Sequence, residues 1–170
     1  MKNNKGFTLI ELLVVVAIIG ILAAVGVVAY NGYTGAAKKN AAKTIHANLI
    51  KYVAAEYSKC TIDDSDTIMQ KGGTGGVACS TADAQGNVTF VTASQIVTHL
   101  VGATTPLEDK NPYSTGSAAV RSSTSAGAGF VSITATTDNL ITVLTCFTDG
   151  KTGNECTETG NQLTNTISID

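Results

Sequence analysis

The chain has 170 residues, of which 44% are hydrophobic, and its formal net charge is −2, from 11 basic and 13 acidic side chains. This length allows one domain plus an anchor, and the charge balance excludes the strongly basic surface typical of a general nucleic-acid-binding protein. The hydrophobic residues concentrate in the N-terminal segment, whereas the remainder is rich in Thr, Ser, Gly and Asn, as expected of a soluble head.

An apolar stretch from Phe7 to Ala29 is interrupted by one carboxylate, Glu11. A charge at the centre of a bilayer costs roughly 2.5–3.5 kcal/mol on insertion scales, so an acidic residue in such a helix needs a positive partner.

Residues 1–6 form a short basic segment closed by Gly6, which is typical of a leader peptide. Cutting after Gly6 would expose an amine on Phe7. In a helix that starts at Phe7, Glu11 shares the face of that amine, although Glu11 can equally meet the amine of a neighbouring copy.

The segment Gly6-Phe7-Thr8-Leu9-Ile10-Glu11, with the apolar run to Ala24, resembles the N-terminus of the type IV pilin family, bacterial filament subunits made as precursors with a short basic leader. The resemblance implies cleavage between Gly6 and Phe7 by a prepilin peptidase, methylation of the Phe7 amine and a role for Glu11 in subunit docking. It also implies a homopolymer built by pilus assembly machinery, with the precursor in the bacterial inner membrane and the product in an extracellular pilus. Many family members carry a proline near the end of the apolar run, where this chain has Val28.

The apolar run is long enough to cross a membrane once. As a helix at about 1.5 Å per residue, the run from Leu12 to Ala29 spans roughly 27 Å, close to the ~30 Å thickness of a bilayer's hydrocarbon core. Basic residues before the run, and Tyr30 and Tyr33 after it, place the N-terminus on the cytoplasmic side. We therefore expect a transmembrane and assembly helix over residues 7–29. Two alternatives stay open: a secretory signal cleaved after Ala29, which would release a soluble binding domain, and a plain single-pass anchor.

The helix is expected to continue as an amphipathic segment over residues 30–58. Residues 36–43 are strong helix formers. Apolar residues then recur at three- and four-residue spacing and form one stripe: Ile45, Leu49, Tyr52, Val53 and Tyr57. One helix from about Phe7 to Ser58 is therefore predicted, with its stripe covered by the head.

Residues 59–170 are expected to form a globular head. Acidic and glycine-rich runs predict a loop from Thr61 to Ala78. A short strand over residues 87–91 and a helix over residues 92–100 follow, with Thr92 and Gln95 at capping-box spacing. Two Thr-, Val- and Ile-rich runs, 130–136 and 140–147, predict a hairpin, and residues 165–169 a third strand. The predicted fold class is α+β, a long N-terminal helix packed against a small antiparallel sheet.

Four cysteines lie outside the apolar run, at Cys60, Cys79, Cys146 and Cys156. An even number with no Cys-x-x-Cys spacing favours disulfides over a zinc site. Three pairings are possible, and Cys60–Cys79 with Cys146–Cys156 is preferred because each closes a short, glycine-containing loop. The second of these pairs resembles the C-terminal disulfide loop of many pilins.

Two acidic segments were considered as calcium sites. The run Asp63-Asp64-Ser65-Asp66 departs from the EF-hand pattern, so a solvated loop is favoured. The Glu108–Tyr113 loop, with Asn111-Pro112-Tyr113, loosely resembles a metal-binding loop of secretion-system pseudopilins, but a Pro-bounded turn is favoured there, and no metal site is predicted.

No catalytic set and no cofactor motif is found, so an enzyme is not expected. His46 and His99 are predicted on separate helices, and no nucleophile or phosphate-loop motif is present. Lys38, Lys39 and Lys43 could contact DNA or anionic lipid, but a solvated helix face beside the membrane is favoured.

These observations predict a structural subunit of a type IV pilus. A type II secretion pseudopilin or a minor pilin is the alternative within the same family. Adhesion, motility and DNA uptake are not distinguished by the sequence, because they depend on the surface of the head.

Overall fold

The structure is a computed structural model that describes residues 6–103, 105–125, 127–147, 156 and 160–169. The chain forms two compact units, Met1–Ala37 and Lys38–Asp170. Residues 1–5 of the predicted leader lie outside the described residues. The helices and strands, in chain order, are α1 (Leu9–Ile62), β1 (Thr67–Ile68), β2 (Val77–Ala78), β3 (Ser80–Ala82), β4 (Val88–Phe90), α2 (Ala93–Val101), β5 (Lys110–Asn111), β6 (Ser114–Ala118), β7 (Val120–Ser122), β8 (Val131–Thr137), β9 (Leu140–Cys146) and β10 (Gln162–Ser168).

The predicted α+β class is confirmed, with one long N-terminal helix and small sheets. Helix α1 begins at Leu9, two residues later than expected, because Thr8 is its N-cap residue. Its end lies at Ile62, four residues beyond the expected Ser58, and the backbone N–H of Asp63 still donates to the Lys59 carbonyl at 2.9 Å.

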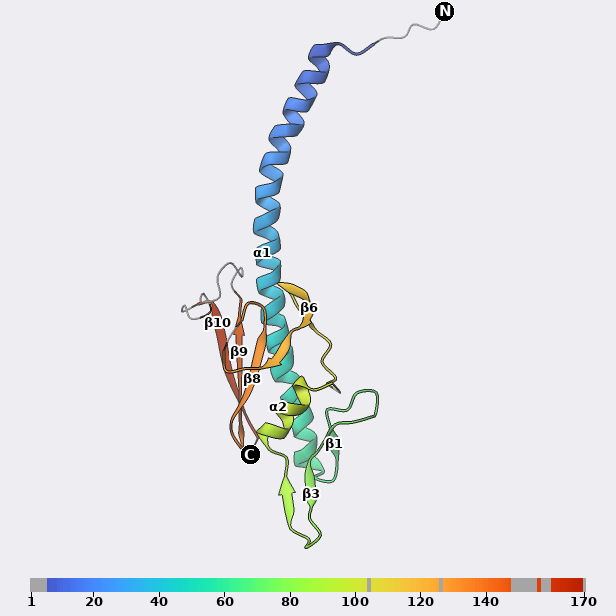
Figure 1. The fold of residues 1–170 in the computed structure, drawn as a ribbon, viewed down its shortest axis with the longest axis vertical. Coiled ribbons are helices and arrows are strands. Elements are labelled where there is room, and N and C mark those ends of the chain that lie inside the picture. The colour runs from blue at the N-terminus through green and yellow to red at the C-terminus, as the bar shows by residue number, and fades with distance from the viewer. Residues whose placement is uncertain (1–5, 104, 126, 148–155, 157–159, 170) are drawn as a thin grey trace, which may run out of the picture. The chain divides into compact units, whose positions relative to one another are not determined.

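The main sheet has the strand order β10-β9-β8-β7. Figure 1 shows β8, β9 and β10 side by side, next to residues 38–62 of α1. The predicted β8–β9 hairpin and the third strand β10 are confirmed, and both pairings are antiparallel. A fourth strand that was not predicted, β7, joins β8 in parallel. Strand β7 has only three residues, and its last residue is exposed, so the sequence shows too little alternation of apolar and polar residues to predict a strand there.

The hydrophobic core of the second unit lies between α1, α2 and the sheet. The stripe on α1 is confirmed, with Leu49 and Val53 buried and Ile45, Tyr52 and Tyr57 partly buried. The sheet contributes four fully buried aliphatic residues: Val131, Ile133, Ile141 and Val143. Helix α2 contributes Ile96 and Leu100.

The predicted capping box of α2 is present. The Thr92 side chain accepts from the Gln95 backbone N–H, and the Gln95 side chain accepts from the Thr92 backbone N–H at 2.8 Å. Reciprocal bonds of this kind satisfy two N–H groups that a helix start otherwise leaves unpaired. The helix therefore begins at Ala93, next to the position that the sequence indicated.

The segment Thr61 to Ala78 is not the plain loop that was expected, because β1 and β2 pair within it as a small antiparallel hairpin. The glycine run makes this possible, since Gly72, Gly73, Gly75 and Gly76 all have positive φ. At Gly76 a Cβ atom would lie 2.7 Å from the Ile68 carbonyl oxygen, so a larger residue would force the two strands apart.

Candidate functional site

The apolar half of α1 exposes nearly all of its surface. None of this apolar segment is buried, and α1 is the one helix among the described residues that is long and apolar enough to cross a membrane. The exposed fractions of this segment's large apolar side chains range from 76% at Leu9 to 52% at Ile18. A surface of this kind is stable only in lipid or against other apolar helices.

Glu11 is held by Thr8 at the start of this helix. The backbone N–H of Thr8 donates to Glu11 Oε2 at 2.9 Å, and the Thr8 hydroxyl donates to the same oxygen at 2.6 Å. In return, the Glu11 backbone N–H donates to Thr8 Oγ1 at 3.4 Å. Thr8 and Glu11 thus form a capping box, and the carboxylate lies in the first turn, where the helix dipole favours negative charge.

The expectation that Phe7 and Glu11 share a helix face concerns a chain cut after Gly6, so it stays a prediction. Phe7 precedes α1, because the helix begins at Leu9, and the described contacts of the Glu11 carboxylate are made by Thr8. The Gly6–Phe7 peptide bond lies in exposed, non-helical backbone. Thr8 and Glu11 are three residues apart, the spacing of a capping box. A capping box was predicted only for Thr92 and Gln95, so the one at Thr8 was missed.

A groove of about 740 Å³ lies beside this helix start. It is lined by Phe7, Ile10, Glu11, Leu12, Val14 and Val15. Five of these side chains are apolar and one is a carboxylate. The site can therefore receive an apolar surface that carries one positive group.

The three lysines predicted to form a basic patch contact aromatic rings of the head. The ammonium groups of Lys39 and Lys43 lie 5.3 and 4.8 Å from the ring centre of Phe147, and that of Lys38 lies 5.8 Å from the ring centre of Tyr113. Contacts of this type stabilise exposed sites by about 0.5–1 kcal/mol. These lysines therefore have a structural role, besides any contact with lipid or nucleic acid.

The segments considered for calcium make contacts of other kinds. Glu108 forms an ion pair with Lys71 at 2.7 Å, and this contact lowers the pKa of Glu108. Asn111 is fully buried; its side chain donates to the Ala128 carbonyl at 2.9 Å and accepts from the Tyr113 N–H at 2.8 Å, as in a Pro-bounded turn. Within the described ranges, no three His, Cys, Asp or Glu residues group as metal ligands would.

The two histidines lie on separate helices, as predicted, and make contacts that were not predicted. His46 is buried between α1 and the sheet, where its ring nitrogens lie 2.8 Å from Thr145 Oγ1 and 2.9 Å from Asn165 Oδ1. His99 Nε2 lies 2.9 Å from the Met69 carbonyl oxygen. The burial of His46 could have been predicted from the sequence, because its spacing with Leu49 and Val53 places it on the buried stripe of α1.

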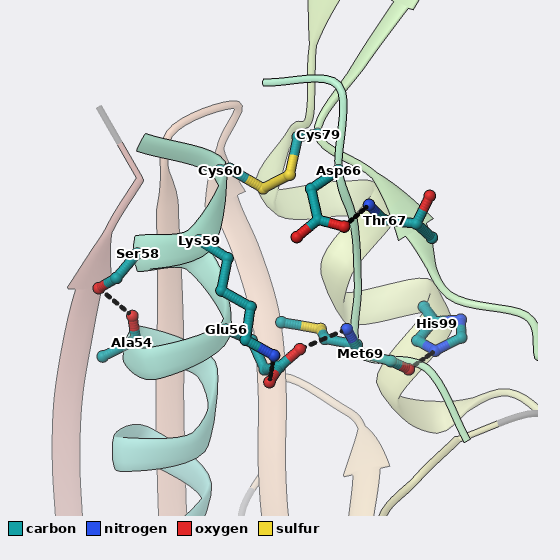
Figure 2. A network of polar contacts seen from close by, with 10 residues as sticks. All are labelled: Ala54, Glu56, Ser58, Lys59, Cys60, Asp66, Thr67, Met69, Cys79 and His99. Atoms are coloured by element: carbon teal, nitrogen blue, oxygen red, sulfur yellow. Dashed lines mark hydrogen bonds and ion pairs between the residues drawn. A yellow bond between two sulfur atoms is a disulfide. The ribbon is translucent and has the colours of Figure 1, made fainter. Parts of the chain in front are cut away.

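Two disulfides join Cys60 to Cys79 and Cys146 to Cys156. These are the pairings preferred from the sequence. Figure 2 shows the first bridge at the end of α1. It ties the helix to the residue between β2 and β3 and so closes the segment that contains the β1–β2 hairpin.

The comparisons with known proteins each match only part of the chain. A family model described as the prokaryotic N-terminal methylation motif matches residues 1–27. A fimbrial protein of Moraxella nonliquefaciens is 42% identical over 69 residues, which are 39% of this chain and 45% of that protein. A fimbrial protein of Pseudomonas aeruginosa is 68% identical over 34 residues, 20% of this chain and 22% of its own length. The type IV major pilin protein PilE1 of Neisseria gonorrhoeae is 63% identical over 35 residues, 21% of each chain.

The chain thus spans less than half the length of these relatives. No solved structure matches it. The fold and the site define a class: a protein with one exposed apolar helix that begins at an acid-containing cap, followed by an α+β head. Over part of its length, the chain is similar to fimbrial proteins and type IV major pilins, and its first 27 residues match the N-terminal methylation motif.

Proposed function

We propose that the chain is a structural subunit of a type IV pilus. In this proposal a prepilin peptidase cuts between Gly6 and Phe7, the Phe7 amine is methylated, and α1 moves from the inner membrane into a bundle of identical helices. The observation that carries the proposal is the exposed apolar helix with one carboxylate in its first turn. The relatives named as fimbrial proteins and type IV major pilins support it.

Packing of α1 against other copies is supported by its small residues. Lipid and packed helices are similarly apolar, so assembly gains little from hydrophobic transfer and depends on close packing. A Cβ atom at Gly20 or Gly26 would meet nothing within 4 Å in this chain, so the subunit's own fold does not require glycine there. Glycines at these positions suit the close approach of a second helix.

Glu11 would fix the register of assembly. Both hydrogen bonds from Thr8 end on Oε2, which leaves Oε1 directed to no other described residue. In the assembled state Oε1 would accept from the methylated amine of a neighbouring subunit's Phe7. A subunit displaced by one step would leave its carboxylate unpaired in an apolar bundle, at a cost of several kcal/mol.

The mature N-terminus tests the processing step. N-terminal mass spectrometry of protein sheared from cells should find N-methylated Phe7 as the first residue. A protein that begins at Tyr30 would instead be the secreted binding domain of the alternative. A protein that keeps Met1 would be an unprocessed anchor.

Substitution of Glu11 tests the assembly step. We expect Glu11→Ala and Glu11→Gln subunits to be cleaved normally but to give at least about tenfold fewer filaments, because one charge of the pair is lost while the apolar surface is kept. Glu11→Gln retains an oxygen acceptor for Thr8 and so separates charge from capping. Leu13→Ala is the matched control on the same turn. Filament yields of the Glu11 variants equal to that of Leu13→Ala would contradict the role of Glu11.

A pseudopilin or minor pilin is the second candidate within the family. The N-terminal motif and the apolar helix do not distinguish a major pilin, a minor pilin and a pseudopilin. Their copy number in the filament does. Quantitative mass spectrometry of sheared filaments should find this chain as the main component if it is the major subunit.

A further inference from the structure

Met69 directly follows β1 and has an unusual backbone conformation at the start of the β1–β2 loop. Its φ is 60°, and it is the one non-glycine residue with positive φ in the described part of the chain. Its side chain is fully buried, as is that of Ile68. A side chain in the left-handed region is strained, so the surrounding contacts must hold this backbone in place.

Two helices hold the Met69 backbone from opposite ends (Figure 2). Glu56 on α1 accepts from the Met69 N–H, with Oε2 2.6 Å from the nitrogen. The Met69 carbonyl oxygen lies 2.9 Å from His99 Nε2 on α2. The other carboxylate oxygen of Glu56 pairs with Lys59. These contacts join α1, the hairpin and α2 at one residue.

The Cys60–Cys79 disulfide closes the same segment at a separate point. Because this bond is covalent, it keeps the segment attached to the end of α1 even where the polar contacts fail. Loss of the Glu56 contact would therefore open the hairpin locally without detaching it from the head.

We propose that Glu56 is an acid-released clasp, whose carboxylate holds the hairpin of residues 67–78 closed over the core and frees it when protonated. Protonation removes the negative charge that strengthens the bond to the Met69 N–H and the pair with Lys59. The strained turn at Met69 then relaxes, and Ile68 and Met69 become accessible to solvent.

The charges around Glu56 set the direction of the response. Burial raises the pKa of Glu56, but the hydrogen bonds from Lys59 and the Met69 N–H, with the Lys59 charge, outweigh it, so the pKa lies below the usual 4.5. A carboxyl group with a lowered pKa stabilises the fold above its unfolded pKa and loses that effect as the pH falls through the folded value. The clasp is therefore closed at neutral pH and opens as the pH falls through the lowered pKa of Glu56.

Of the other titratable groups near the clasp, none contacts the Met69 N–H; the Asp66 carboxylate accepts from the Thr67 N–H at 2.7 Å. Tyr52, on the same helix, is neutral at low pH. His99 donates from Nε2 whether its ring is neutral or protonated, so the Met69 carbonyl stays held. Lys71, in the hairpin segment, pairs with Glu108; acid also removes this exposed ion pair, but the pair makes no contact with the Met69 N–H. Glu56 is thus the group whose protonation frees the Met69 N–H.

Met69 itself reports the opening, because the chain's other methionine is Met1. The full chain in detergent micelles would be exposed to dilute hydrogen peroxide at pH 7, 5, 4 and 3, and sulfoxide at Met69 measured by mass spectrometry of a digest. We expect the oxidation rate to rise about tenfold or more between pH 5 and pH 3. Far-UV circular dichroism should stay unchanged over the range in which the rate rises.

Two variants separate the clasp from general acid effects. Glu56→Gln should oxidise faster than wild type at pH 7 and show little further rise in acid, because its amide is always uncharged. Glu108→Gln, the matched control, should follow the wild-type pH profile. The proposal is overturned if the wild-type rate does not change with pH, if Glu56→Gln keeps the wild-type profile, or if the rate rises only together with loss of the circular dichroism signal.

Discussion

At Tyr52, burial and charge act on one side chain in the same direction. Burial, together with the nearby Glu56 carboxylate, raises the pKa of Tyr52 to about 12, because a phenolate would be poorly solvated and close to another negative charge. The neutral phenol is therefore the form that the fold stabilises.

This predicts the alkaline behaviour of the protein. A folded pKa raised above the unfolded value of about 10 means that Tyr52 contributes stability fully below pH 10, and that this contribution is lost as the pH rises toward 12. Phenolate absorbance near 295 nm, followed against pH, should show a late step that Tyr52→Phe removes. A titration curve unchanged by Tyr52→Phe, apart from total amplitude, would contradict the prediction.

Gly129 lies at a position where no side chain larger than a hydrogen atom fits. Its φ is +72°, and a Cβ atom there would collide with the side chains of Asn111 and Tyr113. We expect Gly129→Ala to lower the free energy of unfolding by about 2–4 kcal/mol, from left-handed strain and overpacking together. Urea unfolding followed by circular dichroism measures this.

Gly116→Ala is the control, because a Cβ atom at Gly116 would meet nothing within 4 Å. It should change stability by no more than about 0.5 kcal/mol. Equal effects of the two substitutions would show that the turn at Gly129 tolerates a side chain.

At the scale of elements, His46 joins one helix to two strands. Because Asn165 Oδ1 can only accept, His46 Nε2 carries a proton and donates to it, and in the neutral ring Nδ1 accepts from the Thr145 hydroxyl. Thr145 is fully buried on β9, so water cannot replace His46 there without a change in packing. These bonds fix the register of α1 against the sheet.

We therefore expect His46→Ala to destabilise the protein by about 2–4 kcal/mol, from the cavity and the unpaired Thr145 hydroxyl. Thermal unfolding by circular dichroism would measure the effect. Lys51→Ala, an exposed position on the same helix, is the control and should have little effect. A His46→Ala variant as stable as Lys51→Ala would show that the buried bonds add nothing.

At the scale of the whole molecule, two disulfides close separate segments of the second unit. The bridged residues are 19 and 10 positions apart in the chain. In the chain-entropy model each bridge stabilises the fold by about 3 kcal/mol, because it restricts the unfolded chain. The bridges matter more in a head of this size than in a larger domain, because its core is small.

Replacing Cys60 and Cys79 together by serine should thus lower the free energy of unfolding by about 3 kcal/mol. Urea unfolding without reductant compares this variant with wild type, and unfolding of both with reductant is the control. If the two proteins were equally stable without reductant, the first bridge would be dispensable.

Local patterns in the sequence were sufficient to predict several elements. Apolar spacing predicted the stripe around Leu49 and Val53, the spacing of Thr92 and Gln95 predicted the start of α2, and two Thr- and Val-rich runs predicted the β8–β9 hairpin. Each depends on neighbours within a few residues, where side-chain period and capping chemistry act directly.

The sequence by itself determined the apolar helix, the acid near its start and the α+β class, since hydrophobic period and charge position do not depend on distant contacts. Only the tertiary structure decided that β7 joins in parallel, that His46 binds two strands, and that Met69 is held in a left-handed turn. Partners in these contacts lie up to 119 residues apart. Such contacts form only when the core brings the segments together, and local propensity carries no information about them.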